Sequence, residues 1–280
     1  MKIVTLTVAL PGLTLGNMGS RSGIKNYRVS FNFYITPGVQ WLVIATFAVF
    51  FLQVLIRVFA GPFAHQKLLI WFGLVPAGVF PGLRIWQPFT YIFLHDPNDF
   101  LHVLFNMLML WMFGRELELV WGKARFIRYY FLTGVGAGLI EVLVKTIPTF
   151  LGRPPSDIPT IGASGAIFGI FAACAILFPD RQVGIFFLPI RMSMRSFVLL
   201  LAGMEFFLPL LLRSAGDNVS HICHLGGMLV GWIYLRRGSF LYGVRNTVSD
   251  WQHRRNRKRF EVYIDKHKKE PPSRPDNWVN

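Results

Sequence analysis

A serine with small neighbours, together with histidines in two other apolar runs, forms the set of residues in this chain that could do chemistry. Ser164 lies in the segment GASGAIFG, residues 162–169, at the start of an uncharged apolar run, and the other runs carry His102 with Asn106, and His224. A serine hydroxyl attacks a carbonyl efficiently when a base accepts its proton, and neutral histidine is the common base near pH 7. These residue types favour nucleophilic catalysis at Ser164 if the chain brings them together.

The amino-acid composition indicates whether these residues lie in a soluble protein or in a membrane protein. Of the 280 residues, 53% are hydrophobic and 15% are charged, which is more apolar and less charged than a typical soluble domain. The net charge of +15 could suggest nucleic acid, but the basic residues gather at the chain ends and in short loops, as membrane topology requires. We therefore expect a membrane protein without a nucleic-acid partner.

Six stretches are candidates for crossing the membrane, since about 20 apolar residues span about 30 Å of hydrocarbon. They lie near residues 39–58, 99–117, 126–147, 158–178, 196–213 and 219–236. A seventh stretch, residues 68–83, is interrupted by five Gly and Pro residues. Backbone groups freed by such breaks cannot face lipid, so this stretch is predicted to be an interfacial or re-entrant loop packed on protein. Read as a crossing helix, it would give seven spans.

The distribution of Lys and Arg tests this topology. With six spans and both termini inside, 23 of the 29 basic residues fall on the cytoplasmic side, as the positive-inside rule requires. Seven spans would move the 12 basic residues from Arg236 onward to the other side. The predicted organisation is a cytoplasmic N-terminal segment (1–37), a membrane domain (38–236) and a basic cytoplasmic tail (237–280). The start of the chain reads only loosely as a signal peptide, and Met18 is an alternative start.

The topology predicts one layer for the polar residues, because the second, fourth and sixth spans all enter from the outside. With a rise of about 1.5 Å per residue, His102, Asn106, Ser164 and His224 lie roughly 5 to 10 Å below the outer ends of their spans. Polar groups at that depth usually face the bundle interior or a water-filled cavity. His102 and Asn106 are four residues apart, so they share a helix face.

Glycine spacing predicts which helices touch. The fourth and sixth spans carry small residues four positions apart, Gly165 with Gly169 and Gly227 with Gly231. Such pairs let helix backbones approach closely in a membrane. His224 shares a face with Gly227, so this packing favours contact between His224 and Ser164. We find no acidic residue in the layer and assign no partner to Glu205, so the sequence predicts a Ser-His dyad in place of a triad.

At these residues the chain resembles the rhomboid family of intramembrane serine proteases, over about residues 38–236. The matching motifs, in chain order, are His102-x3-Asn106, Gly114-x3-Glu118-x3-Gly122, Gly162-x-Ser164-Gly165 and His224-x2-Gly227-x3-Gly231. The resemblance implies an all-α membrane protein, a six-transmembrane-helix rhomboid-like bundle with the interfacial or re-entrant first loop. It also implies transmembrane protein substrates that are cut near their outer ends.

By this resemblance Ser164 is the nucleophile, His224 is the base, and His102 and Asn106 are oxyanion partners, helped by backbone N–H groups near the start of span 4. Trp86-Gln87 stands where many members of the family have Trp-Arg, and Cys223 stands where alanine usually precedes the histidine. We expect no cofactor and no metal, because no His-Glu-x-x-His motif occurs.

Other polar residues receive structural interpretations. Glu118 is expected to fix the turn between spans 2 and 3, and His95 is expected to belong to loop structure. Glu141 and Lys145 have the i, i+4 spacing of a helical ion pair. Cys174 and Cys223 lie inside apolar runs, so no disulfide framework is implied.

Two alternatives stay open at this point. The chain could be a non-catalytic rhomboid-like protein that binds transmembrane segments, whereas a transporter is disfavoured because internal repeats are lacking. The chain from Arg236 onward holds 12 basic and 5 acidic residues, and it fits either binding to anionic lipid headgroups, at about 1 kcal/mol per basic residue, or a solvated topology anchor. The expected location is multi-pass in the plasma (inner) membrane of a bacterium.

Overall fold

The computed structural model describes residues 34–152, 156–184, 191–212 and 220–236. From Thr36 onward these residues belong to one unit of the chain, and that unit is the subject here. The predicted tail, 237–280, and residues 1–33 of the predicted N-terminal segment lie outside the described residues.

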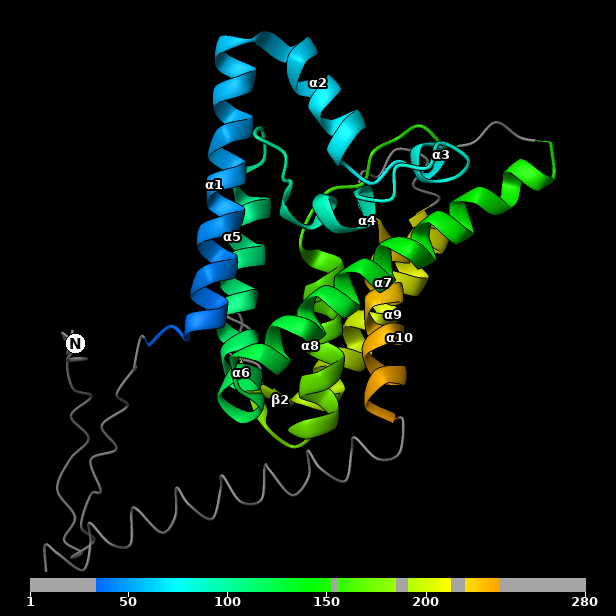
Figure 1. Cartoon of the computed structure of the whole chain (residues 1–280). Coiled ribbons are helices and arrows are strands. Elements are labelled where there is room, and N and C mark those ends of the chain that lie inside the picture. Colours follow the sequence, from blue (N-terminus) through cyan, green and yellow to red (C-terminus); the bar gives the residue numbers. More distant parts are fainter. Residues whose placement is uncertain (1–33, 153–155, 185–190, 213–219, 237–280) are drawn as a thin grey trace, which may run out of the picture. The chain divides into compact units, whose positions relative to one another are not determined.

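The described residues are mostly helical (Figure 1). Before Ser164 the elements are α1 (Pro37–Phe59), α2 (Gly61–Phe72), α3 (Pro76–Val79), α4 (Gln87–Thr90), the 3-10 turn η1 (Tyr91–Phe93), α5 (Phe100–Met109), the π-helical η2 (Leu110–Gly114), α6 (Arg115–Trp121) and α7 (Lys123–Phe150). After it the elements are α8 (Ser164–Leu177), β1 (Gln182–Gly184), β2 (Arg191–Ser193), α9 (Met194–Leu212) and α10 (His221–Arg236).

Each of the six stretches predicted to cross the membrane contains helix in the structure. By length and apolar composition, two of the described helices, α1 and α7, could each cross a bilayer unaided, and α8 is a shorter apolar helix. Strands β1 and β2 pair antiparallel, with Val183 opposite Met192. This small sheet is an addition that the all-α prediction did not include.

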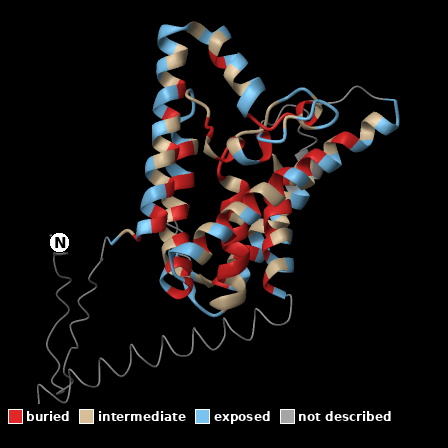
Figure 2. Cartoon of the chain, viewed as in Figure 1, coloured by how far each residue is buried: buried red, intermediate tan, exposed pale blue. Residues whose placement is uncertain are grey.

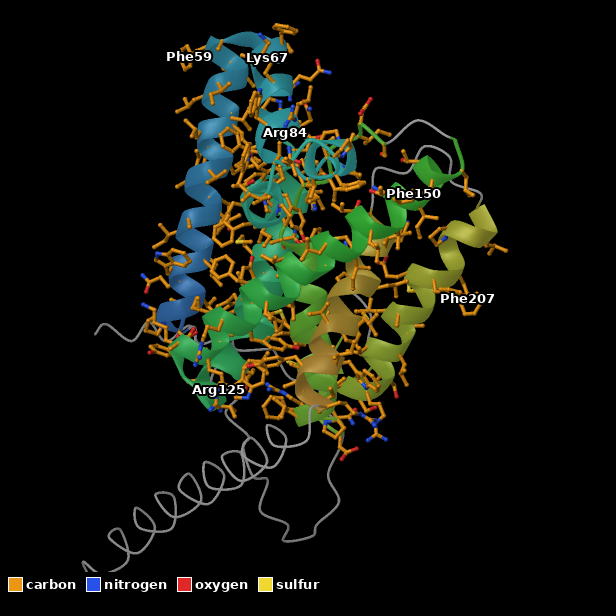
Figure 3. All side chains as sticks on the ribbon, turned by 45° about the vertical axis from the view of Figure 1, so that its right-hand side comes forward. Phe59, Lys67, Arg84, Arg125, Phe150 and Phe207 are labelled. Atoms are coloured by element: carbon orange, nitrogen blue, oxygen red, sulfur yellow. The ribbon has the colours of Figure 1, made fainter. Side chains whose placement is uncertain are left out.

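Large apolar side chains stand on the outside of the helices. Phe59, Phe150 and Phe207 are 82%, 76% and 66% exposed, and they project from α1, α7 and α9 (Figure 3). The buried residues lie where the helices face one another (Figure 2). So much exposed apolar surface is uncommon on a soluble monomer and suits contact with lipid or with other apolar partners.

The closest helix packing joins α8 and α10. A Cβ atom on Gly227 would overlap the carbonyl oxygen of Gly165, and one on Gly231 would lie 3.1 Å from the carbonyl oxygen of Gly169. The two backbones therefore touch without intervening side chains. This contact confirms the helix pairing that the glycine spacing predicted.

The start of α8 differs from the prediction of a span that is helical from residue 158. The helix begins at Ser164, and the preceding chain pairs with the loop after α2 through two backbone hydrogen bonds of 2.9 Å between Leu74 and Thr160. Pro159 has no N–H to donate within a helix. Gly162 has a φ of +126°, which side-chain-bearing residues rarely adopt. These two residues keep the approach to Ser164 extended.

The segment 68–83 is packed on protein, as predicted. Leu74 and Val75 are buried, and the side chain of Gln87 accepts a hydrogen bond from the N–H of Val75 and donates one to the carbonyl of Ile70. Gln87 is itself fully buried. The glutamine that departs from the family pattern therefore pairs the backbone groups that the glycine and proline breaks release.

The side chain of Glu118 stabilises the start of α1, a contact that the sequence did not predict. Its carboxylate accepts hydrogen bonds from the N–H groups of Gly38 at 2.7 Å and Val39 at 2.9 Å, the first turn of α1. The N–H groups of a helix's first turn have no partner inside the helix, so a buried carboxylate there is well satisfied. The turn between α6 and α7 is made by Gly122, whose φ is +77°. At that turn the backbone carbonyl of Glu118 accepts a hydrogen bond of 2.8 Å from the N–H of Gly122, so Glu118 contributes to the turn through its main chain and to α1 through its side chain.

Candidate active site

The structure brings Ser164 and His224 into direct contact. The Nε2 atom of His224, on α10, lies 2.7 Å from the Oγ atom of Ser164, the first residue of α8. The ring of Phe168 stacks on the imidazole with centroids 4.2 Å apart and planes within 4°. His224 is 9% exposed. A buried imidazole with its ring plane fixed on one side and Nε2 on a hydroxyl has the geometry of a general base.

An acidic residue lies beside this pair, contrary to the prediction that none shares its layer. The Oε2 atom of Glu205, on α9, is 3.0 Å from Nδ1 of His224 and 2.6 Å from Nδ1 of His221. The sequence alone gives Glu205 no partner, because helical spacing within α9 does not indicate which residue of α10 it meets. A carboxylate in an apolar helix does indicate that a polar partner exists, since buried carboxylates are usually paired.

His102 and Asn106 both lie on α5, one turn apart, as their spacing predicted. A Cβ atom on Gly162 would lie 3.2 Å from Nε2 of His102 and 3.8 Å from Oγ of Ser164. His102 and Ser164 therefore flank the same glycine. Asn106 is 8% exposed, and its amide nitrogen lies 3.1 Å from Nε2 of His95.

His95 belongs to the loop before α5, as expected, but it also has a direct link to the site. It is fully buried, and burial lowers the pKa of its imidazole to about 3, so the ring is neutral at physiological pH. Because the amide of Asn106 donates to Nε2, the ring hydrogen is on Nδ1, which lies 3.4 Å from the carbonyl of Phe93. This link was not predicted, since His95 lies outside any helical periodicity in the sequence.

Backbone donors are available next to the hydroxyl. Because α8 begins at Ser164, the N–H groups of its first turn have no acceptor within the helix, and the helix dipole adds positive potential there. Among the described residues, no group of three or more His, Cys, Asp or Glu side chains is arranged to hold a metal ion. The polar groups that converge here are a hydroxyl, an imidazole base and several N–H donors.

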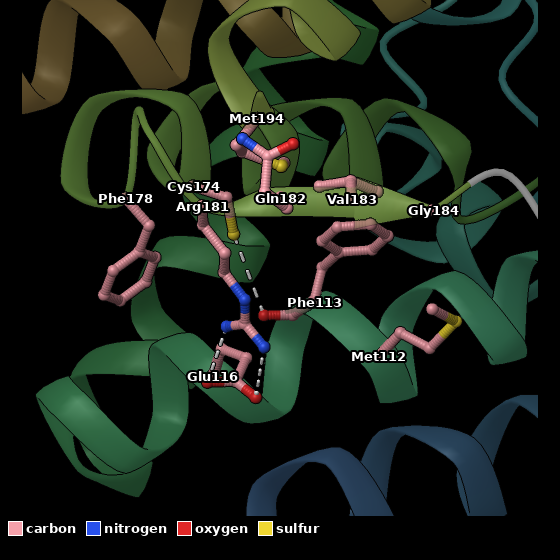
Figure 4. A pocket seen from close by; sticks show the side chains of 10 residues that line it. All are labelled: Met112, Phe113, Glu116, Cys174, Phe178, Arg181, Gln182, Val183, Gly184 and Met194. Carbon is pink, nitrogen blue, oxygen red and sulfur yellow. Dashed lines mark hydrogen bonds and ion pairs between the residues drawn. The ribbon is translucent and has the colours of Figure 1, made fainter. Parts of the chain in front are cut away.

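A cavity of about 130 Å³ lies elsewhere, between η2, α6, the end of α8 and the small sheet (Figure 4). Its walls include Cys174 and Met194, and its polar edge is the ion pair between Arg181 and Glu116, with nitrogen–oxygen distances of 2.9 and 3.2 Å. The hydrogen bond to Glu116 raises the pKa of Arg181. Neither Ser164 nor His224 lines this cavity, so it is not part of the serine-histidine site.

Comparisons with known proteins give the family. The model of the rhomboid domain matches residues 82–238, and that range contains all four polar residues of the predicted layer. The chain is 31% identical over 150 residues to a Bacillus subtilis protein named rhomboid protease YdcA, an alignment covering 53% of this chain and 64% of that protein. It is 28% identical over 142 residues to the mitochondrial rhomboid protein 1 of Saccharomyces cerevisiae, covering 49% and 38%.

A longer alignment runs to rhomboid-like protease 3 of Toxoplasma gondii, which is 26% identical over 205 residues and covers 70% of both chains. The chain thus spans 64% of the Bacillus protein and 38% of the yeast protein. Relatives named as mitochondrial occur beside the bacterial one. The comparisons indicate a membrane protein, and they do not support the expected plasma membrane of a bacterium.

Proposed function

The chain belongs to the rhomboid family, and on that premise we propose that it is an intramembrane serine endopeptidase that hydrolyses peptide bonds in or near transmembrane segments of other proteins. The observation that carries the proposal is the 2.7 Å contact between Ser164 Oγ and His224 Nε2. Names of relatives that include the word protease support the same reaction class.

In the proposed reaction His224 accepts the hydroxyl proton as the oxygen of Ser164 attacks the substrate carbonyl. The resulting imidazolium then gives the proton to the leaving amine, so the first product departs and an acyl-enzyme is left on the serine. Water attacks this ester with His224 again as base, which releases the second product and restores the hydroxyl. Proton and leaving group balance in both halves without a cofactor.

The negative oxygen of each tetrahedral intermediate needs donors that are already in place. We assign this role to the N–H groups at the start of α8, to His102 and to the amide of Asn106. The position of His102 beside Gly162 supports it, as does the anchoring of the Asn106 amide by His95. A donor held rigidly before the reaction loses little energy in reorganisation when charge develops.

We further propose that the six predicted spans form one transmembrane bundle over residues 38–236, with both termini on the cytoplasmic side and a basic tail, 237–280, beyond it. The exposed aromatic residues on α1, α7 and α9 support contact with lipid. Cysteines placed at Lys67 in α2 and Lys123 in α7 would test it, because both side chains are exposed and the native Cys174 and Cys223 are buried. A membrane-impermeant maleimide should label only the first from outside. Labelling of both positions from one side would contradict the topology.

The reaction is tested by reconstituting the protein in liposomes with a panel of single-span proteins. We expect cleavage near the outer ends of some substrates, labelling of Ser164 by a fluorophosphonate, and loss of both in Ser164→Ala. Normal cutting by the alanine variant would rule out the proposed nucleophile. Substrate capture without cleavage by either protein would instead favour the alternative, a non-catalytic rhomboid-like protein that binds transmembrane segments.

A further inference from the structure

Glu205 is the one acidic side chain that approaches the serine-histidine pair within the described part of the chain. It lies on α9, it is 15% exposed, and its Oε2 atom contacts Nδ1 of His224 at 3.0 Å and Nδ1 of His221 at 2.6 Å. The nearest residues along α9, Met204 and Phe206, are apolar and exposed. A carboxylate in such a helix is costly unless it has a partner, and here both partners are imidazoles of α10.

Glu205 contacts His224 at Nδ1, the ring nitrogen that does not contact Ser164. To act as base through Nε2, a neutral imidazole must carry its hydrogen on Nδ1. An ionised carboxylate is a pure acceptor, so Glu205 next to Nδ1 favours that tautomer. The same negative charge stabilises the imidazolium that forms when the ring takes the proton of Ser164.

Both histidines contact the same carboxylate oxygen, Oε2 of Glu205. His221 has the shorter contact and holds the Glu205 side chain at the start of α10. The Nδ1 atom of His224 is within ion-pair distance of Oε2 but is not aligned as a hydrogen bond. Contacts of catalytic groups are often misaligned in a free enzyme and tighten when substrate binds.

We propose that Glu205 is a positioning residue for the reaction, which would make the site a Ser164-His224-Glu205 triad in place of the dyad that the sequence predicted. This inference rests on the proposed protease function. It goes beyond that function by adding a fourth helix, α9, to α5, α8 and α10, which carry the other site residues.

The experiment compares the purified wild-type protein with Glu205→Gln and Glu205→Asp in liposomes. Glu205→Gln keeps the shape and removes the charge, so kcat should fall by roughly 10- to 1,000-fold while KM changes little. Glu205→Asp should restore part of kcat, because the charge returns one methylene further away. The matched control is Glu116→Gln, the same chemical change at a carboxylate beside the separate cavity, and it should leave kcat unchanged.

The pH profile separates positioning from a structural effect. Among the described residues, the titratable groups around His224 are Glu205 of α9, His221 of its own helix and, through its charge, His102 of α5. Without the negative charge the ring is harder to protonate, so the acidic limb of kcat/KM should move to lower pH in Glu205→Gln. A purely structural loss would lower kcat/KM at every pH and leave the limb in place, which would overturn the proposal.

The results distinguish failure of the Glu205 proposal from failure of the protease proposal. If wild type cleaves in a Ser164-dependent way but Glu205→Gln has the wild-type kcat and pH profile, the positioning role is wrong and the protease stands. If wild type neither cleaves nor reacts with a fluorophosphonate, both proposals fall. Should Glu205→Gln not fold, as judged by thermal unfolding, the uncharged Glu205→Ala replaces it: a wild-type kcat and pH limb in that variant, or a lowered kcat without a shifted limb, would reject the role.

Discussion

The Nε2 atom of His95 lies 3.1 Å from the amide nitrogen of Asn106, so a loop residue orients a side chain of the candidate oxyanion site. The backbone N–H of His95 donates to the side chain of Gln53 on α1, whose amide nitrogen lies 3.4 Å from Nε2 of His65 on α2. A buried hydrogen-bond network of this kind holds each of its side chains in a fixed orientation. Helix α2 is thereby connected to the site through three side chains.

Replacing His95 by alanine should lower kcat more than it changes KM, because the Asn106 amide loses the acceptor that directs its second hydrogen. We expect a loss of about 10- to 100-fold, somewhat less than removal of an oxyanion donor itself. The double variant with Asn106→Ala provides the control, since two residues that act through one group are not additive. Additive losses would show that His95 acts elsewhere.

The buried, neutral His95 should also make stability depend on pH. The folded protein keeps this imidazole uncharged down to a pKa of about 3, whereas the unfolded chain protonates it near its ordinary value of 6.5. Acid therefore favours the unfolded state between these values, and stability falls as pH decreases from about 6.5 towards 3. His65 contributes in the same direction, because burial and the charge of Arg57 lower its pKa.

Thermal unfolding in detergent at several pH values measures this effect. The unfolding midpoint of wild type should drop below about pH 6.5, and His95→Gln, which cannot take up a proton, should show a shallower drop. Carboxylates titrate in the same range in both proteins, so the difference between the two slopes isolates the histidine. Identical slopes would mean that His95 does not contribute.

Gly227→Ala should separate α8 from α10, since the added methyl group would overlap the carbonyl oxygen of Gly165. Backbone cannot rotate away as a side chain can, so we expect a loss of at least about 2 kcal/mol in unfolding free energy and a strong loss of cleavage. The matched control is Gly203→Ala on α9, where a Cβ atom would meet nothing within 4 Å. That variant should be as stable as wild type or more stable by up to about 1 kcal/mol. Equal effects of the two substitutions would count against the close contact.

Glu118→Ala should loosen the start of α1 without reaching the catalytic atoms. It leaves the N–H groups of Gly38 and Val39 without their acceptor in a buried position, which costs about 1 to 3 kcal/mol. Glu116→Ala, which removes a partly exposed carboxylate paired with Arg181, should cost no more than about 1 kcal/mol. Chemical denaturation of both variants gives the comparison, and a larger cost for Glu116 would contradict the structural assignment of Glu118.

Sequence pattern predicted those relationships that depend on spacing along one helix. Gly227 and His224 share a face because they are three residues apart, and that face packs on Gly165 as expected. The contact between Ser164 and His224 followed from the same reasoning. The catalytic roles of these residues remain predictions until the variants are tested.

Relationships between separate helices could not be predicted in this way. Nothing in the spacing of α9 indicates that Glu205 meets His224, because the rotation of one helix against another is decided by packing. The start of α8 at Ser164 has a signal in the sequence, since Pro159 and Gly162 are both helix breakers, whereas the apolar composition around them favours a longer span. His95 lay in a loop, where no periodicity indicates burial.

The backbone contact between α8 and α10 limits how such a site can change during evolution. The separation of Ser164 from His224 is set by glycine main chain, which has no rotamers to alter. Side chains elsewhere around the site can then be exchanged, and new substrates accommodated, while the distance between nucleophile and base is kept. Selection for a new specificity should therefore find its variants on α5, α9 and the loops, and should leave the glycines of α8 and α10 unchanged.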